Sequence, residues 1–196
     1  MLRRMALGSL VVLVIVALVW MVAAIAPRVP MRGTPPAVSP ATAVPVGPER
    51  KIKATLYYIS EDGLSLPGVQ RDVLFAESID EQARRIVEAE LGTAPPPYAS
   101  PVPAGTSLRA LFIGQRGDAF VDLGIDVRTK HPGGALYELF TIYSIVNALT
   151  VNLPAITRVQ ILIDGKEVDT LAGHVDLRHP LQKNLKWTEL QTDNDK

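Results

Sequence analysis

Few residues in this chain could form a site for covalent catalysis. The sequence contains no cysteine, and its only histidines are His131, His174 and His179. Nucleophilic catalysis needs a nucleophile, a base beside it and a group that orients the base. The sequence has no Gly-x-Ser-x-Gly turn and no glycine-rich phosphate-binding loop. It therefore predicts no catalytic triad and no bound cofactor.

A short segment near the C-terminus has the residue types of a metal site. His174, Asp176 and His179 could supply the nitrogen and oxygen ligands that zinc accepts. On a strand, however, the first two side chains point to one face and His179 points to the other. Pro180 follows directly and restricts the backbone further. We therefore expect no metal site, and we interpret these residues as the polar side chains of a loop.

Two acidic residues lie beside apolar segments and could act as a pair. Hydrolysis by paired carboxylates needs two acids about 5–9.5 Å apart, on either side of the bond that is cleaved. Asp122 ends a predicted strand, and Glu138 lies in the first turn of a predicted helix. Nothing in the sequence brings the two carboxyl groups together. We assign no catalytic residue, and a hydrolase that uses this pair stays an alternative.

The helix predicted over residues 136–151 is apolar around its axis but contains polar residues. The helix dipole stabilises a carboxylate in the first turn, which explains Glu138. Asn147 stands between apolar neighbours, so we expect it to be buried and to hydrogen-bond the backbone of a loop. The candidate ligand-binding or structural polar residues are Asp122, Glu138, Asn147 and Thr150.

The surrounding pattern predicts the elements that position these residues. Ser78 and Glu81 form a capping box, which begins a helix that ends at Gly92. Strands are predicted at 53–59, 69–75, 108–113, 119–123, 157–163 and 166–168. The order is β-β-α-β-β-α-β-β. It indicates a single α+β domain in which both helices pack on one face of one sheet.

The N-terminus has the character of a membrane anchor. Residues 5–26 carry no charge, and as a helix they would span about 33 Å, enough for a hydrocarbon core of about 30 Å. Arg3 and Arg4 favour a cytoplasmic location for residues 1–4. We therefore expect a single-pass anchor in a bacterial inner membrane, with the soluble domain in the periplasm or outside the cell. A signal peptide cleaved after Ala24-Ile25-Ala26, which has small residues at its first and third positions, is the alternative.

The rest of the chain divides into a linker, a globular domain and a tail. Residues 27–52 are rich in proline and should form an extended spacer. Residues 53–185 form the predicted domain, and residues 186–196 a polar tail. Lys and Arg together number 20, as do Asp and Glu, and no basic run is present. We therefore expect no nucleic-acid partner.

Several short segments, in this order along the chain, resemble the GerMN domain family. They are Tyr57-Tyr58, Pro103-Ala104-Gly105-Thr106, Val121-Asp122-Leu123, Gly134 with Glu138, residues 143–150, residues 159–165, residues 173–177 and Pro180-Leu181. The resemblance implies an extracytoplasmic, membrane-anchored bacterial domain found in spore-germination and cell-envelope proteins. Such domains are associated with peptidoglycan and have no established enzymatic role. The matching polar positions are Asp122, Glu138, Asn147 and Thr150.

This chain departs from the pattern of the family in three ways. Ala148 stands where threonine is usual, the sequence holds one domain copy where two are usual, and it has no lipoprotein cysteine. An envelope role in a bacterium that need not sporulate fits these departures better than germination. We therefore expect a non-enzymatic envelope module that binds a wall component or a protein partner. A peptidoglycan hydrolase and an oligomeric scaffold are the alternatives, and the oligomeric state stays open.

Overall fold

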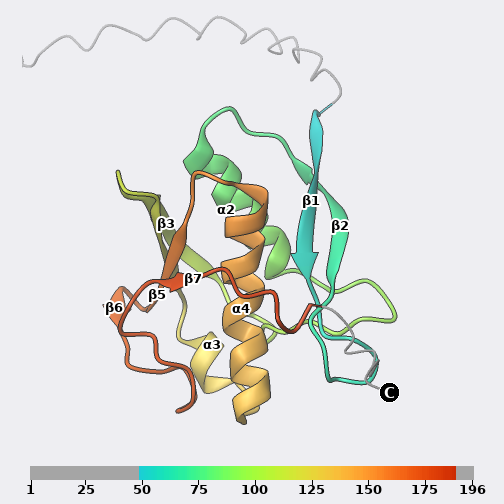
Figure 1. Ribbon diagram of the computed structural model, residues 1–196, viewed down its shortest axis with the longest axis vertical. Helices are drawn as coiled ribbons and strands as arrows, with labels where there is room; N and C mark the ends of the chain where they lie inside the picture. The colour runs from blue at the N-terminus through green and yellow to red at the C-terminus, as the bar shows by residue number, and fades with distance from the viewer. Residues whose placement is uncertain (1–48, 189–196) are drawn as a thin grey trace, which may run out of the picture. The chain divides into compact units, whose positions relative to one another are not determined.

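The computed structural model describes residues 49–188 (Figure 1). The predicted anchor at 5–26, nearly all of the linker and most of the tail lie outside the described residues. Within residues 49–188, no helix has both the length and the apolar character needed to cross a bilayer.

The predicted order of strands and helices is confirmed, with two short additions. The elements are β1 (Lys51–Tyr57), β2 (Gly68–Leu74), α2 (Ile79–Glu90), β3 (Leu108–Ile113), β4 (Asp118–Leu123), α3 (Asp126–Thr129), α4 (Ala135–Asn152), β5 (Arg158–Ile163), β6 (Lys166–Glu167) and β7 (Leu181–Gln182). Helix α3 and strand β7 were not predicted from the sequence. The helix cap is as predicted, because the Ser78 hydroxyl accepts a hydrogen bond from the Glu81 N–H at 3.2 Å.

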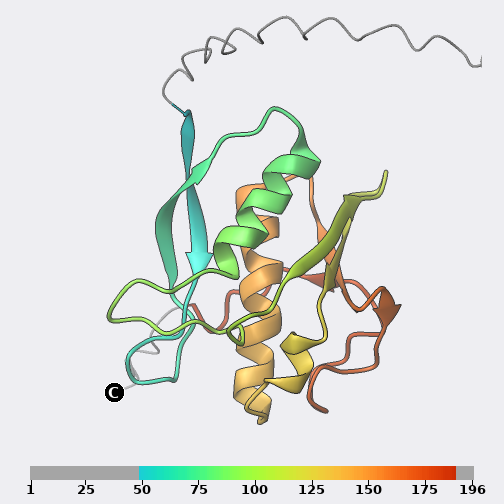
Figure 2. The ribbon, with the colours of Figure 1, turned by 180° about the vertical axis from the view of Figure 1, so that it is seen from behind.

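The strands form two sheets, so the prediction of one sheet with both helices on one face is wrong. Strands β1 and β2 pair as a separate antiparallel sheet, while β3, β4, β5 and β6 form the larger sheet in that order, with β7 also paired to β5. Figures 1 and 2 show α2 and α4 between the two sheets. The reason is the apolar circumference of α4, since a helix that is hydrophobic on all sides must be covered on more than one side.

Helix α4 therefore contributes to two hydrophobic cores. Towards the larger sheet it buries Ile142, Ile145, Val146 and Leu149. Towards β1 it buries Phe140 and Ala148, which lie in one cluster with residues of β1 and α2. This double packing makes α4 the central element of the described domain.

Two connections bring distant parts of the chain to α4. Strands β4 and β5 pair in parallel, so the chain between them crosses the larger sheet through α3 and α4. After β7, the C-terminal segment runs across α4 (Figure 1). Its Trp187 carbonyl accepts a hydrogen bond from the Leu66 N–H at 2.6 Å, and the Trp187 ring meets Phe140 edge to face. The packed chain thus extends past residue 185 to Trp187.

Candidate functional site

Glu138 is the most fully bonded of the predicted polar residues. Its Oε1 accepts hydrogen bonds from the backbone N–H groups of Leu171 at 2.9 Å and Ala172 at 2.8 Å. Its Oε2 accepts from the backbone N–H of His174 at 2.8 Å and lies 3.0 Å from Nδ1 of the same histidine. The side chain is 0% exposed. Glu138 therefore holds the segment 171–174 against α4, a role much larger than the dipole effect that the sequence suggested.

The environment of Glu138 keeps this carboxyl ionised. Burial raises its pKa, but the hydrogen bonds from Ala172, from the His174 backbone and from the His174 ring together lower it below the usual value. A general acid needs a raised pKa and access to the substrate. Glu138 has neither feature, and its four hydrogen-bonding partners surround it.

Asn147 is buried, as predicted, and links α4 to the C-terminal segment. Its side-chain Nδ2 donates to the carbonyl of Asn184 at 2.8 Å, and its Oδ1 accepts from the Asn184 N–H at 3.0 Å. This reciprocal pair satisfies both ends of the amide with loop backbone. Because Asn147 is 0% exposed, it has no surface to offer to a ligand.

Asp122 stabilises the turn between β5 and β6. Its Oδ1 accepts from the Gly165 N–H at 2.7 Å, and its Oδ2 accepts from Nε of Arg109 at 3.1 Å. Arg109 also donates to Asp164 at 2.9 Å. Asp164 and Gly165 both have positive φ, at 51° and 74°, as a tight hairpin turn requires. Asp122 therefore fixes a strained turn with a carboxylate that is 7% exposed.

The four predicted residues do not form one site. Thr150 donates its hydroxyl to the carbonyl of Val146 in its own helix, at 2.7 Å. Asp122, Glu138 and Asn147 each bond a different segment and share no hydrogen-bond partner. In the segment 174–179, which was interpreted as a polar loop, Asp176 accepts a hydrogen bond from Arg178 at 2.7 Å. Among residues 49–188, no group of three His, Asp or Glu side chains could hold a metal ion.

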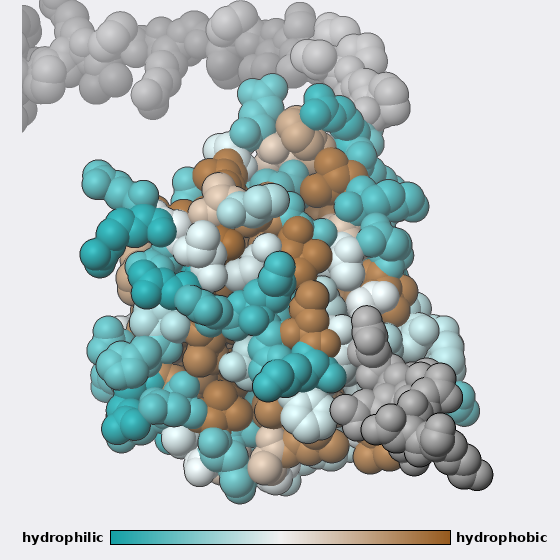
Figure 3. Space-filling view, in the orientation of Figure 1, coloured by the Kyte–Doolittle hydropathy of each residue, from teal (hydrophilic) through white to brown (hydrophobic). Residues whose placement is uncertain are grey.

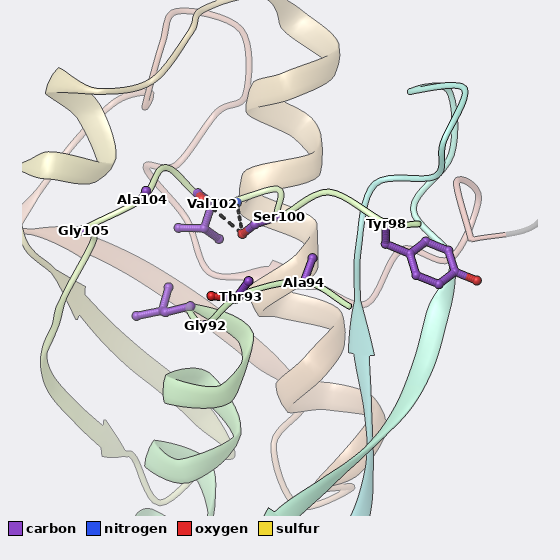
Figure 4. Close-up of a pocket in the computed structure, with 9 residues that line it drawn as sticks. Gly92, Thr93, Ala94, Tyr98, Ser100, Val102, Ala104 and Gly105 are labelled. Carbon is purple, nitrogen blue, oxygen red and sulfur yellow. Dashed lines mark hydrogen bonds between the residues drawn. The ribbon is translucent and has the colours of Figure 1, made fainter. Parts of the chain in front are cut away.

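A pocket of about 370 Å³ lies where α2 ends. In Figure 4 the residues that follow α2 face the stretch 100–105, while the ring of Tyr98 points away towards β1 and β2. That ring stacks on Tyr58, with the ring centroids 6.3 Å apart. The lining residues are small, apolar or uncharged: Leu91, Gly92, Thr93, Ala94, Tyr98, Ser100, Val102, Ala104 and Gly105.

The pocket has binding chemistry without catalytic chemistry. The Ser100 hydroxyl donates to the Val102 carbonyl at 3.1 Å and accepts from the Val102 N–H at 3.3 Å, so it shapes the loop. Thr93 supplies a second hydroxyl beside apolar side chains. No lining residue is a carboxylate, a histidine or a lysine. The pocket can therefore hold a small uncharged group, but its lining residues include no strong general acid or base.

Sequence reasoning did not find this pocket. The prolines between residues 95 and 103 predicted only an irregular loop. The available signal was the set of small residues that flank the prolines, Gly92 and Ala94 on one side and Ala104 and Gly105 on the other. Small side chains at both ends of a rigid loop leave space that larger ones would fill.

The chain matches a known protein family and several solved structures. The family model Germane, described as sporulation and spore germination, matches residues 55–169. A search of curated proteins finds no match. The first GerMN domain of the sporulation protein GerM from Bacillus subtilis is 19% identical, with a TM-score of 0.51, and the match covers 68% of this chain and 96% of that one.

Two further solved structures are similar. The tandem GerMN domains of the same Bacillus subtilis protein are 19% identical with a TM-score of 0.51, covering 69% of this chain and 46% of that one. A protein from Clostridium perfringens described as a lipoprotein is 23% identical with a TM-score of 0.48, covering 68% of this chain and 88% of that one. At these identities the solved structures show the fold alone, whereas the family model spans more than half of the chain. The chain therefore belongs to the Germane family of sporulation and spore germination, and its described domain has the GerMN fold.

Proposed function

We propose that this chain is a non-enzymatic module of the bacterial cell envelope. In this proposal, residues 5–26 anchor it in the inner membrane, residues 27–52 act as a spacer, and the GerMN domain lies outside the cytoplasm. The domain binds a wall component or an envelope protein through the pocket that begins at Leu91. The family, which is described as sporulation and spore germination, supports a role of this kind.

The burial of Glu138 is the observation that carries the non-enzymatic part of the proposal. A hydrolase that used Asp122 and Glu138 would need both carboxyl groups at the bond that is cleaved. Glu138 is 0% exposed and receives hydrogen bonds from Leu171, Ala172 and His174. A carboxylate that no substrate can reach, and that holds a loop in place, supports a structural role.

The pocket is the feature that best supports binding. Its lining combines apolar contact with the Thr93 hydroxyl, which suits a small uncharged group. Hydrophobic residues also reach the surface elsewhere. On the face in Figure 3 they form narrow bands separated by hydrophilic residues, not one broad apolar patch. That face therefore offers less support for an oligomeric scaffold than the pocket offers for ligand binding.

A soluble fragment for the test should begin at residue 49. The predicted boundary at 53 would remove the first residues of β1, which pair with the end of β2. It would also remove Arg50, whose carbonyl accepts from the Phe75 N–H at 2.8 Å and whose guanidinium lies 3.5 Å from the centroid of the Phe75 ring. Residues 49–196 keep all of these contacts.

We expect residues 49–196 to co-sediment with purified peptidoglycan, and we expect Ala104→Trp to reduce the retained fraction at least fivefold. Ala104 is an exposed lining residue, so the indole would occupy the pocket without disturbing the core. Ala135→Trp is the matched control, because Ala135 is an exposed alanine at the start of α4 and does not line the pocket. Wild-type protein that stays in the supernatant would contradict wall binding. Equal retention of both variants would exclude the pocket as the binding site.

A further inference from the structure

Glu90, the last residue of α2, carries a carboxyl group that is completely enclosed. Its Oε2 accepts a hydrogen bond from the Tyr57 N–H of β1 at 3.0 Å. Its Oε1 is the only buried side-chain nitrogen or oxygen of residues 49–188 that has no hydrogen-bond partner. An unpaired oxygen of this kind is costly if the carboxyl is ionised, because the full desolvation penalty of a charge is then uncompensated.

Within residues 49–188, no positively charged side chain is among the groups that act on this carboxyl. The titratable groups near Glu90 are the phenols of Tyr57 and Tyr58, whose pKa values its carboxyl raises. Arg71 of β2 has the opposite effect and lowers the pKa of Tyr58. From α4 the group that acts on it is the Ser144 hydroxyl, which does not titrate. Burial raises the pKa of Glu90 well above its usual value, against smaller opposing effects of the Tyr57 N–H and Ser144.

The two phenols near Glu90 stay neutral with it. Burial, followed by the nearby Glu90 carboxyl, raises the pKa of Tyr57 to about 12. The same two causes raise the pKa of Tyr58. Neither tyrosine can therefore change charge in the range from pH 5 to 8, and a pH effect in that range cannot come from these two groups.

The oxygen of the Ser144 hydroxyl is free to accept a hydrogen bond. Its Oγ donates to the carbonyl of Thr141 at 3.1 Å, within α4. That bond uses the only hydroxyl hydrogen and leaves the lone pairs of Oγ for an acceptor role. No hydrogen bond joins Ser144 to Oε1 of Glu90, so Oε1 stays unpaired. A hydrogen on Oε1 would remove the charge that makes this enclosed oxygen costly.

We propose that Glu90 is protonated in the folded domain, and that it acts as a pH-sensitive latch whose Oε2 accepts from the Tyr57 N–H while the proton neutralises the enclosed Oε1. The latch joins the end of α2 to β1. The next residues, Leu91 to Ala94, line the pocket. Loss of the proton therefore weakens the support of the pocket wall. This inference does not depend on the identity of any ligand.

The direction of the pH effect follows from linkage. The pKa of Glu90 in the folded domain lies above its unfolded value of about 4.5. Below pH 4.5 the carboxyl is protonated in both states, so it does not lower the stability of the fold. As the pH rises above 4.5, the unfolded chain releases the proton while the folded domain retains it. Between the unfolded and the folded pKa, the folding equilibrium constant therefore falls by up to tenfold for each pH unit.

The test is hydrogen–deuterium exchange of the full-length chain in detergent from pH 5 to 8, corrected for intrinsic exchange. For β1, for α2 and for residues 91–94, we expect the local opening constant of the wild type to rise, relative to Glu90→Gln, by up to tenfold per pH unit. Glu88→Gln should behave like the wild type, because Glu88 lies on the same helix but is exposed. The same pH dependence in the wild type and in Glu90→Gln would overturn the proposal.

A measurement on the wild type alone covers the case in which Glu90→Gln fails to fold. An infrared spectrum of the folded chain at pH 7 should contain the C=O band of one protonated carboxyl group. A spectrum without that band at neutral pH would overturn the proposal as well.

Discussion

Glu138→Gln should lower the free energy of unfolding by about 2–4 kcal/mol. Glutamine keeps one acceptor oxygen, which can still serve the N–H groups of Leu171 and Ala172. Its amide nitrogen, however, would face the backbone N–H of His174, so two donors would meet in a buried place. The segment 171–174 should then detach from α4. The helix dipole alone would have predicted a loss of only about 0.3–1 kcal/mol.

Urea denaturation of residues 49–196 measures this effect, and its pH dependence adds a second check. The hydrogen bonds hold the pKa of Glu138 below its usual 4.5. The stabilisation is therefore fully present above pH 4.5 and is lost as the pH falls below that value. The gap between wild type and Glu138→Gln should narrow on acidification. Glu88→Gln, an exposed change, should shift the midpoint very little. A loss below 1 kcal/mol for Glu138→Gln would contradict the assigned contacts.

Asn147→Leu should cost about 1–3 kcal/mol. Leucine has the same branching as asparagine, with two methyl groups in place of the amide oxygen and nitrogen, so it can neither donate nor accept. The N–H and carbonyl of Asn184 would both lose their partner, at 3.0 and 2.8 Å in the folded domain. We expect the C-terminal segment to loosen, including the contact between Trp187 and Phe140.

The matched control for Asn147 lies one turn further along α4. Thr150 bonds only the Val146 carbonyl of its own helix, so Thr150→Val should change the stability by less than about 1 kcal/mol. Denaturation followed by Trp187 fluorescence, in the fragment that lacks Trp20, compares the two variants. If Asn147→Leu melts like Thr150→Val, the bonds to Asn184 do not stabilise the domain.

Local patterns in the sequence predicted the elements well. The alternation in β5, the spacing of apolar residues in α2 and the capping box at Ser78 are all properties of neighbours along the chain. The burial of Asn147 was also predictable, because its apolar neighbours lie on every side of a helix. The matches to the GerMN pattern added the family before any geometry was known.

The contacts that hold the loops and strands in place are between distant residues, and the sequence did not reveal them. Glu138 is 36 residues from His174, and Glu90 is 33 residues from Tyr57. Neither spacing has a periodic signal. The separation into two sheets also depends on which strands pair, and β1 pairs only with β2. Glu90, which is buried at the end of α2, was not among the residues that the sequence analysis singled out.

We expect this domain to bind peptidoglycan without hydrolysing it. The most direct measurement is the amount of soluble fragment released when the full-length protein is incubated with purified peptidoglycan. We expect no release above that of a buffer control and no difference between wild type and Asp122→Asn, which keeps an acceptor for the Gly165 N–H. Steady release of soluble fragments by the wild type, abolished by Asp122→Asn, would contradict this account and would show that the protein is a hydrolase.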